Sequence, residues 1–222
     1  MAAVARLLDA ELHALFVEDE TLLHASGLPF DREISPVSLR WRKMVPARLE
    51  AEMRADADLA RRLLMEAARA AGVPHHFEVH RGEVSLRVAE ICVESDIVVV
   101  SAPNRMGAET MHGFRLLRET ARHSAASVLF LPPIAGRAHG PVVAVVTGDR
   151  DPGLAVAERI AAKGKERLLV LTTGATGASV DEVAAGLGST RESLIVVTRD
   201  GSTEGARLAG VRGVPVLVVE PI

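Results

Sequence analysis

The chain has 222 residues, of which 48% are hydrophobic, 25% charged and 3% aromatic. This balance is typical of a globular protein and excludes a disordered, collagen-like or disulfide-rich chain. The net charge of -3 gives no overall basic field for nucleic acid, and the single cysteine, Cys92, excludes an intramolecular disulfide. Apolar runs such as Ile97–Val100 are too short to cross a bilayer, and acidic residues interrupt any N-terminal signal sequence. We therefore expect a soluble, cytoplasmic protein.

Short runs of apolar, mostly β-branched residues recur along the chain and predict strands. Most of them lack polar alternation, which is typical of parallel strands buried on both faces. Segments with helical spacing separate most of these runs, so the order favours an α/β fold with right-handed crossovers. The predicted strands are Leu12–Val17, His76–His80, Asp96–Ser101, Ser127–Leu131, Val142–Val146, Arg167–Leu171, Leu194–Val197 and Val214–Val219.

The longest predicted helix is Pro46–Ala71, with proline in its first turn and Gly72 just after its end. Its apolar stripe is predicted to comprise Leu49, Met53, Leu59, Ala60, Leu63 and Leu64. The other predicted helices are 2–10, 83–94, 108–123, 152–163, 178–187 and 203–210, and residues 18–45 are expected to form a long loop.

A break at Pro132–Pro141 (PPIAGRAHGP) predicts a linker between two halves that repeat one pattern. SDIVVVSAPN…HSAASVLFLPP in the first half parallels ESLIVVTRDG…GVRGVPVLVVEP in the second. Together with the opening DAELHALFVED, these residues resemble the universal stress protein superfamily. The resemblance implies two flavodoxin-like parallel-sheet domains in tandem, at 1–133 and 140–222, in a stress-response or signalling protein.

The sequence departs from that superfamily at the features that hold a nucleotide. Members begin with a central strand ending in Asp, whereas the first half here begins in the following helix. Flanking strands could close that gap, another segment could fill it, or the chain start could be truncated. The second half has Val146 or Thr147 in place of the Asp and is shortened, without its edge strand. Neither the stretch Ser101–Gly107 nor that at 198–205 fits the family's G-x2-G-x9-G-S/T phosphate loop.

No G-x-S-x-G, H-E-x-x-H or Walker motif is present, so the sequence favours a non-catalytic protein with a degenerate nucleotide site. No cofactor is expected, although ATP or AMP binding, or a weak ATPase activity, is the alternative. Because α/β sheets place ligands at the carboxyl ends of strands, the candidate ligand-binding residues are Thr147, Gly148, Asp149, Thr198 and Gly201. The competing interpretation is a plain turn, with Asp151 as the N-cap and Pro152 opening the helix.

Three other groups of residues have two interpretations each. His75, His76 and His80 lie around one strand with Glu78, but show no clear tetrahedral set, so no metal is predicted and polar decoration of an edge strand is preferred. The acidic run 18–20 could hold Mg²⁺ or transfer protons, but helix capping is preferred. Cys92 is expected to pack rather than to react.

Apolar residues and the chain's single tryptophan, Trp41, lie in the predicted loop 18–45. They either pack on their own sheet or form a surface for a protein partner or a second subunit. Both halves end in strong apolar strands, which we expect to cover each other's edges within one chain. We also expect a homodimer beyond this internal pairing, with no nucleic acid or membrane partner.

Overall fold

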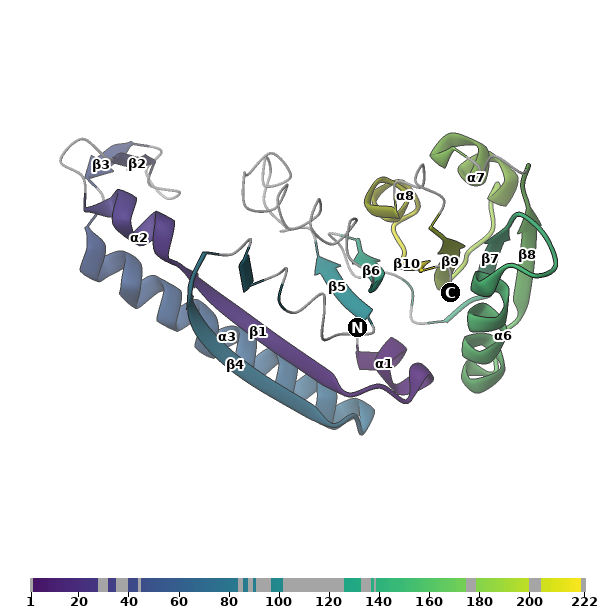
Figure 1. The fold of residues 1–222 in the computed structure, drawn as a ribbon, viewed down its shortest axis with the longest axis horizontal. Coiled ribbons are helices and arrows are strands. Elements are labelled where there is room, and N and C mark those ends of the chain that lie inside the picture. Colours follow the sequence, from purple (N-terminus) through teal and green to yellow (C-terminus); the bar gives the residue numbers. More distant parts are fainter. Residues whose placement is uncertain are drawn as a thin grey trace. The chain divides into compact units, whose positions relative to one another are not determined.

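The computed structural model describes residues 2–27, 32–34, 40–43, 45–83, 86–87, 90, 97–101, 126–132, 137, 139–174, 179–199 and 205–220. The chain divides into two compact units, Ala2–Arg87 and Val88–Ile222, and each is described by itself. Figure 1 labels their helices and strands. The predicted helix 108–123, Cys92 and most of the predicted helix 83–94 lie outside the described residues.

A six-stranded sheet forms the centre of the unit Val88–Ile222, with the order β5-β6-β10-β9-β7-β8. All neighbouring strands run parallel except β6 and β10, which are antiparallel. The strands are β5 (Ile97–Ser101), β6 (Ser127–Leu131), β7 (Val142–Val146), β8 (Leu168–Thr172), β9 (Leu194–Thr198) and β10 (Val216–Val219). Each lies within two residues of its predicted bounds, so the mixed α/β fold with parallel sheets is confirmed.

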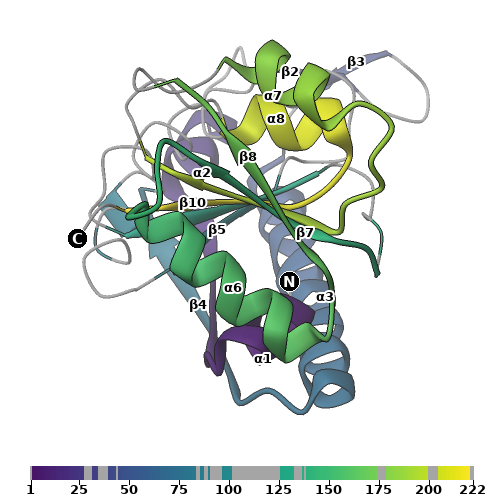
Figure 2. The same ribbon diagram turned by 90° about the vertical axis from the view of Figure 1, so that its right-hand side faces the viewer.

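Helices cover both faces of this sheet. Helix α6 (Pro152–Gly164) packs against β7 and β9 on one face, and α7 (Val180–Leu187) and α8 (Gly205–Arg212) lie on the other (Figure 2). Every residue of β7 and β10 is therefore buried, as the uninterrupted apolar runs predicted. β8 is an edge of the sheet in the described part of the chain. The shortening of the second half stays a prediction.

The antiparallel β6–β10 pair joins the two predicted halves, with Leu129 opposite Leu217. Arg199 reinforces it by donating to the Ala126 carbonyl at 2.7 Å and pairing with Glu220 at 2.7 Å. The predicted pairing of the two terminal strands is thus confirmed. The predicted domains 1–133 and 140–222 do not coincide with the two compact units. The reason is that the β6–β10 pair places one strand of each predicted domain in the same sheet. The division of the sequence into two domains that repeat one pattern stays a prediction.

Helix α8 lies close to both strands of the β6–β10 pair. A Cβ atom at Gly205 would lie 2.6 Å from Phe130 Cδ2 in β6 and 2.7 Å from Val218 Cγ2 in β10. Only glycine fits there without a shift of one of these elements. The helix therefore holds the strands of both halves together.

A parallel strand pair and a long helix form the unit Ala2–Arg87. β1 (Leu12–Asp19) pairs along its whole length with β4 (His75–Gly82), and α3 (Pro46–Ala71) runs along one face of the pair (Figure 1). Helix α1 (Ala2–Leu8) completes the core, which includes Ala5, Leu12, Leu64 and Ala68. Gly72 ends α3 in the left-handed conformation at φ 67°, as predicted.

The predicted apolar stripe of α3 is partly wrong. Leu64 is buried, but Leu59 and Leu63 are 47% and 57% exposed. The buried face instead runs through Ala57, Leu64 and Ala68, because small residues let the helix lie close to the sheet. The prediction relied on large apolar side chains, but Leu59 and Leu63 lie on the outer side of the helix, and two of its three buried residues are alanines.

The predicted loop 18–45 contains regular structure, so this prediction is wrong. It forms helix α2 (Glu20–Ser26) and an antiparallel pair of short strands, β2 (Arg32–Ile34) and β3 (Trp41–Lys43). The Asp19 carboxylate caps α2 by accepting from the amides of Thr21 at 2.9 Å and Leu22 at 3.3 Å. A local capping contact and a local pair of strands explain how this long excursion acquires order.

Among the described residues, β1 pairs with β4 and β5 pairs with β6. The three interpretations of the absent first strand all stay open. No helix among the described residues is long and apolar enough to span a membrane.

Candidate functional site

The candidate site lies where β7 ends and α6 begins. Asp151 is the N-cap of α6, and Pro152 takes the first helical position, where its missing N–H costs nothing. The turn 147–150 brings this aspartate back to the carboxyl end of β7, within hydrogen-bonding distance of Thr147. The capping interpretation of the sequence is therefore confirmed.

The Asp151 carboxylate is the centre of the site. One oxygen, Oδ2, accepts from the Thr147 amide at 3.0 Å and from the Thr147 hydroxyl at 3.4 Å. The other, Oδ1, accepts from the Gly153 amide at 2.9 Å and from the hydroxyl of Thr198 at the end of β9. The carboxylate thus ties two neighbouring strands of the sheet to the first turn of α6.

Gly153 leaves space for this arrangement. Its amide also donates to Thr198 Oγ1 at 3.0 Å, and a Cβ atom there would lie 2.7 Å from that oxygen. A side chain at this position would push Thr198 away from Asp151. Close packing of the helix start against β9 therefore requires glycine.

The structure brings Thr147 and Thr198 together, through Asp151. Gly148 lies in the turn between β7 and α6, Asp149 is exposed in the same turn, and Gly201 falls outside the described residues. Sequence reasoning named Asp151 only as a cap and missed its bond to Thr198. The signal was Asp-Pro-Gly directly after a buried strand, but nothing local could reveal a partner 47 residues away.

This arrangement bears on how an anion could approach the end of β7. Backbone amides at a helix start bind phosphate or other anions in many α/β proteins. Here the amides of Thr147 and Gly153 already donate to a carboxylate of the same chain. An incoming phosphate would have to displace that carboxylate and would be repelled by its charge.

The acidic run at the end of β1 has structural partners. The Glu18 carboxylate is largely buried and accepts from Arg81 at 3.0 and 3.1 Å, and Asp19 caps α2. The preferred capping interpretation is confirmed.

Two other predicted features are resolved in the unit Ala2–Arg87. Trp41 lies in β3 with 65% of its surface exposed, so it does not pack on its own sheet. His76 and His80 both contact Glu78, and His13 of the neighbouring strand joins them, a residue that sequence reasoning missed. His75 lies apart, with its ring 3.4 Å from the Val73 carbonyl.

The parallel strands, the helices on both faces of the sheet and the crossover order define a doubly wound, flavodoxin-like α/β fold. Solved structures of this fold resemble the chain over nearly its whole length. A universal stress protein from Archaeoglobus fulgidus DSM 4304 matches with a TM-score of 0.63 and 13% identity, covering 99% of this chain and 89% of that one. A putative universal stress protein from Pseudomonas aeruginosa UCBPP-PA14 matches at 0.53 and 13%, covering 98% and 95%.

A third structure, the functionally unknown protein PA1789 from Pseudomonas aeruginosa PAO1, matches at a TM-score of 0.55 and 16% identity, covering 99% of this chain and 85% of that one. No family model matches the sequence, and no curated protein matches it either. At these identities the likeness concerns the fold. The fold is that of universal stress protein structures, as the sequence resemblance implied.

Proposed function

We propose that this chain is a non-catalytic, universal-stress-protein-like module that acts in a stress response or in signalling and carries a degenerate nucleotide site. The observation that supports this is the Asp151 carboxylate, which occupies the strand-end amides of Thr147 and Gly153. A cytoplasmic location is part of the proposal.

The test is isothermal titration of the full chain with ATP, AMP and cyclic AMP. We expect no submicromolar binding of any of the three. Submicromolar binding by the wild type contradicts the degenerate site.

A pair of variants sharpens this test. Asp151→Ala removes the charge and frees the Thr147 amide, while the Gly153 amide keeps its bond to Thr198 Oγ1, so the affinity of the variant for nucleotide is expected to exceed that of the wild type. Asp149→Ala removes an exposed carboxylate from the same turn without freeing these amides, and is expected to bind as the wild type does.

The alternative is an adenine-nucleotide-binding protein or weak ATPase of the same fold. It is favoured by the hydroxyls of Thr147 and Thr198, which both donate to the Asp151 carboxylate. They lie at the carboxyl ends of β7 and β9, where sheets of this type hold ligands. Steady phosphate release from ATP that is abolished by Asp149→Ala would support this alternative.

We further propose that the chain forms a homodimer, with Trp41 as a contact for the second copy or for another protein. An exposed tryptophan is a frequent anchor of interfaces. Light scattering at micromolar concentration tests this. A mass near twice 23.6 kDa that falls with Trp41→Ala supports the dimer, and a clean monomer ends the claim.

A further inference from the structure

The outward face of the β1–β4 pair carries an unusual group of side chains. His13 of β1 lies directly opposite His76 of β4, and Glu78 follows two positions along, on the same face. The intervening Phe77 and its neighbour Ala14 pack into the core that Leu64 and Ala68 of α3 help to form. Alternation along both strands therefore sets the two imidazoles and the carboxylate on the side away from α3.

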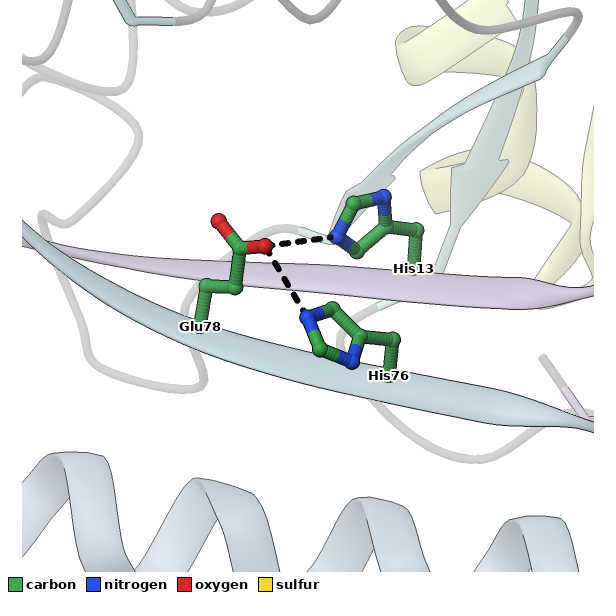
Figure 3. Close-up of side chains that lie close together, drawn as sticks. All are labelled: His13, His76 and Glu78. Atoms are coloured by element: carbon green, nitrogen blue, oxygen red, sulfur yellow. Dashed lines mark hydrogen bonds and ion pairs between the residues drawn. The ribbon is translucent and has the colours of Figure 1, made fainter.

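These side chains converge on one oxygen atom. Glu78 Oε1 lies 2.9 Å from His76 Nε2 and 3.5 Å from His13 Nε2, and the three ligand atoms all lie within 4.8 Å of one another. Figure 3 shows both rings directing a nitrogen toward this carboxylate. The rings meet edge to face, with centroids 4.9 Å apart. The side chains of His13 and His76 are 63% and 55% exposed.

His80 holds the other oxygen of the carboxylate. Its Nε2 lies 2.8 Å from Glu78 Oε2, so three of the chain's eight histidines surround a single glutamate. The cation next along β4, Arg81, pairs with Glu18 and Glu50 and so does not compete for Glu78.

We propose that His13 Nε2, His76 Nε2 and Glu78 Oε1 form a binding site for Zn²⁺ or a similar divalent transition metal, with His80 orienting the carboxylate. Ligand atoms around a tetrahedral zinc ion, each about 2.0 to 2.1 Å from it, lie about 3.3 Å apart. The two distances to Glu78 already bracket that value, and rotation of the exposed His13 ring brings the third into range.

The ligand chemistry selects the metal. Two imidazoles and one carboxylate suit zinc, copper, nickel and cobalt, whereas magnesium and calcium require mostly oxygen ligands. The second contact to the carboxylate, from His80, fixes its orientation in the way that outer partners of metal ligands do. Three protein ligands on an exposed face leave a fourth position for water, so the bound ion remains exchangeable.

The test is titration of the untagged full chain with Zn²⁺ after treatment with a chelator that is then removed. We expect one ion per chain with a micromolar or lower Kd, and a visible absorption band of tetrahedral or five-coordinate type when Co²⁺ replaces Zn²⁺. His13→Asn, His76→Asn and Glu78→Gln are each expected to weaken binding at least about tenfold, since each removes a ligand.

His139→Asn is the matched control, because His139 is also exposed and lies 3.1 Å from a glutamate, Glu166, in the other unit. It is expected to bind Zn²⁺ as the wild type does. Circular dichroism in chelator confirms that the variants fold, since the replaced side chains are at least partly exposed.

Three results would overturn the assignment. They are no zinc binding at micromolar concentrations, equal affinity in His13→Asn and the wild type, and a greater loss in His80→Asn than in His13→Asn. The last would place the ion on β4 alone rather than across the two strands.

Discussion

The six-stranded sheet of the unit Val88–Ile222 and the β1–β4 pair of the unit Ala2–Arg87 bury their strands in different ways. All five residues of β7 and all four of β10 are buried, because helices cover both faces of that sheet. Along β4, by contrast, exposed and half-buried residues follow one another, because α3 covers one face.

This difference explains where chemically capable side chains lie in each region. The covered sheet has polar side chains only at its margins, and at the end of β7 they satisfy one another through Asp151. The open face of the strand pair carries two imidazoles and a carboxylate within its strands, on side chains that are 39% to 63% exposed. The buried region therefore supplies stability, and the half-covered one supplies candidate ligands.

The largest expected effect concerns a buried ion pair at the margin of the covered sheet. Glu192 is fully buried and accepts from Arg212 at 2.7 and 3.0 Å, while Arg212 also donates to the carbonyls of Gly188 and Thr190. Arg212→Met is expected to lower the free energy of unfolding by about 3 to 5 kcal/mol, because it leaves a buried charge without a partner.

Urea unfolding of the full chain, followed through the unit Val88–Ile222, measures this loss. The control is Arg207→Met, which breaks an exposed pair with Asp181 and should change stability by about 1 kcal/mol or less. A loss below that level in Arg212→Met contradicts the role given to the buried pair.

The same pair predicts a dependence of stability on pH. Burial, the largest single influence, raises the pKa of Glu192, but the hydrogen bonds from Arg212, a backbone hydrogen bond at Glu192 and the charges of Arg212 and Arg137 together leave it below the ordinary 4.5. Glu192 therefore binds a proton more readily in the unfolded chain than in the folded one. Its full contribution to the free energy of unfolding is present above the ordinary pKa of 4.5. It is lost as pH falls through the lower, folded pKa. Unfolding midpoints measured across acidic pH should show this loss in the wild type and a weaker one in Arg212→Met.

A matched pair of leucines tests the contrast in burial. Leu217 of β10 is 1% exposed and Leu63 of α3 is 57% exposed. Leu217→Ala is expected to cost about 2 to 5 kcal/mol, because it removes buried contacts and leaves a cavity. Leu63→Ala should change stability by about 0.5 kcal/mol or less. Equal losses in thermal or urea unfolding would show that the outer side of α3 is covered in solution.

The smallest expected effect concerns the cap of α2. Asp19→Ala removes the acceptor for the amides of Thr21 and Leu22 and should cost about 0.5 to 2 kcal/mol of local stability. Hydrogen exchange of the α2 amides measures it, with Glu20→Ala as the control from the same turn. Unchanged exchange in Asp19→Ala would mean that the cap does not hold this helix.

Sequence patterns predicted most of the strands, because runs of Val, Ile and Leu in a covered sheet show their burial directly. They predicted both ends of α3, where proline and glycine act locally, but not its buried face, which depends on how closely the helix approaches the sheet. The order within residues 18–45 was missed because its strands are only three residues long.

The candidate sites were predicted less well, since both depend on residues far apart in the chain. The sequence places Thr147 and Thr198 at strand ends but gives no indication of the bond from Thr198 to Asp151. It places Glu78 beside His76 but not beside His13. The bond to Thr198 and the approach of His13 arise from strand register, which only the folded sheets define.

The central claim is that a carboxylate of the chain itself occupies the anion-binding amides at the end of β7. The most direct test is a crystal structure of the full chain soaked with ATP. We expect Asp151 to remain within hydrogen-bonding distance of the Thr147 and Gly153 amides, with no nucleotide there. Phosphate oxygens bound to those two amides, with the Asp151 side chain turned away, would contradict the claim.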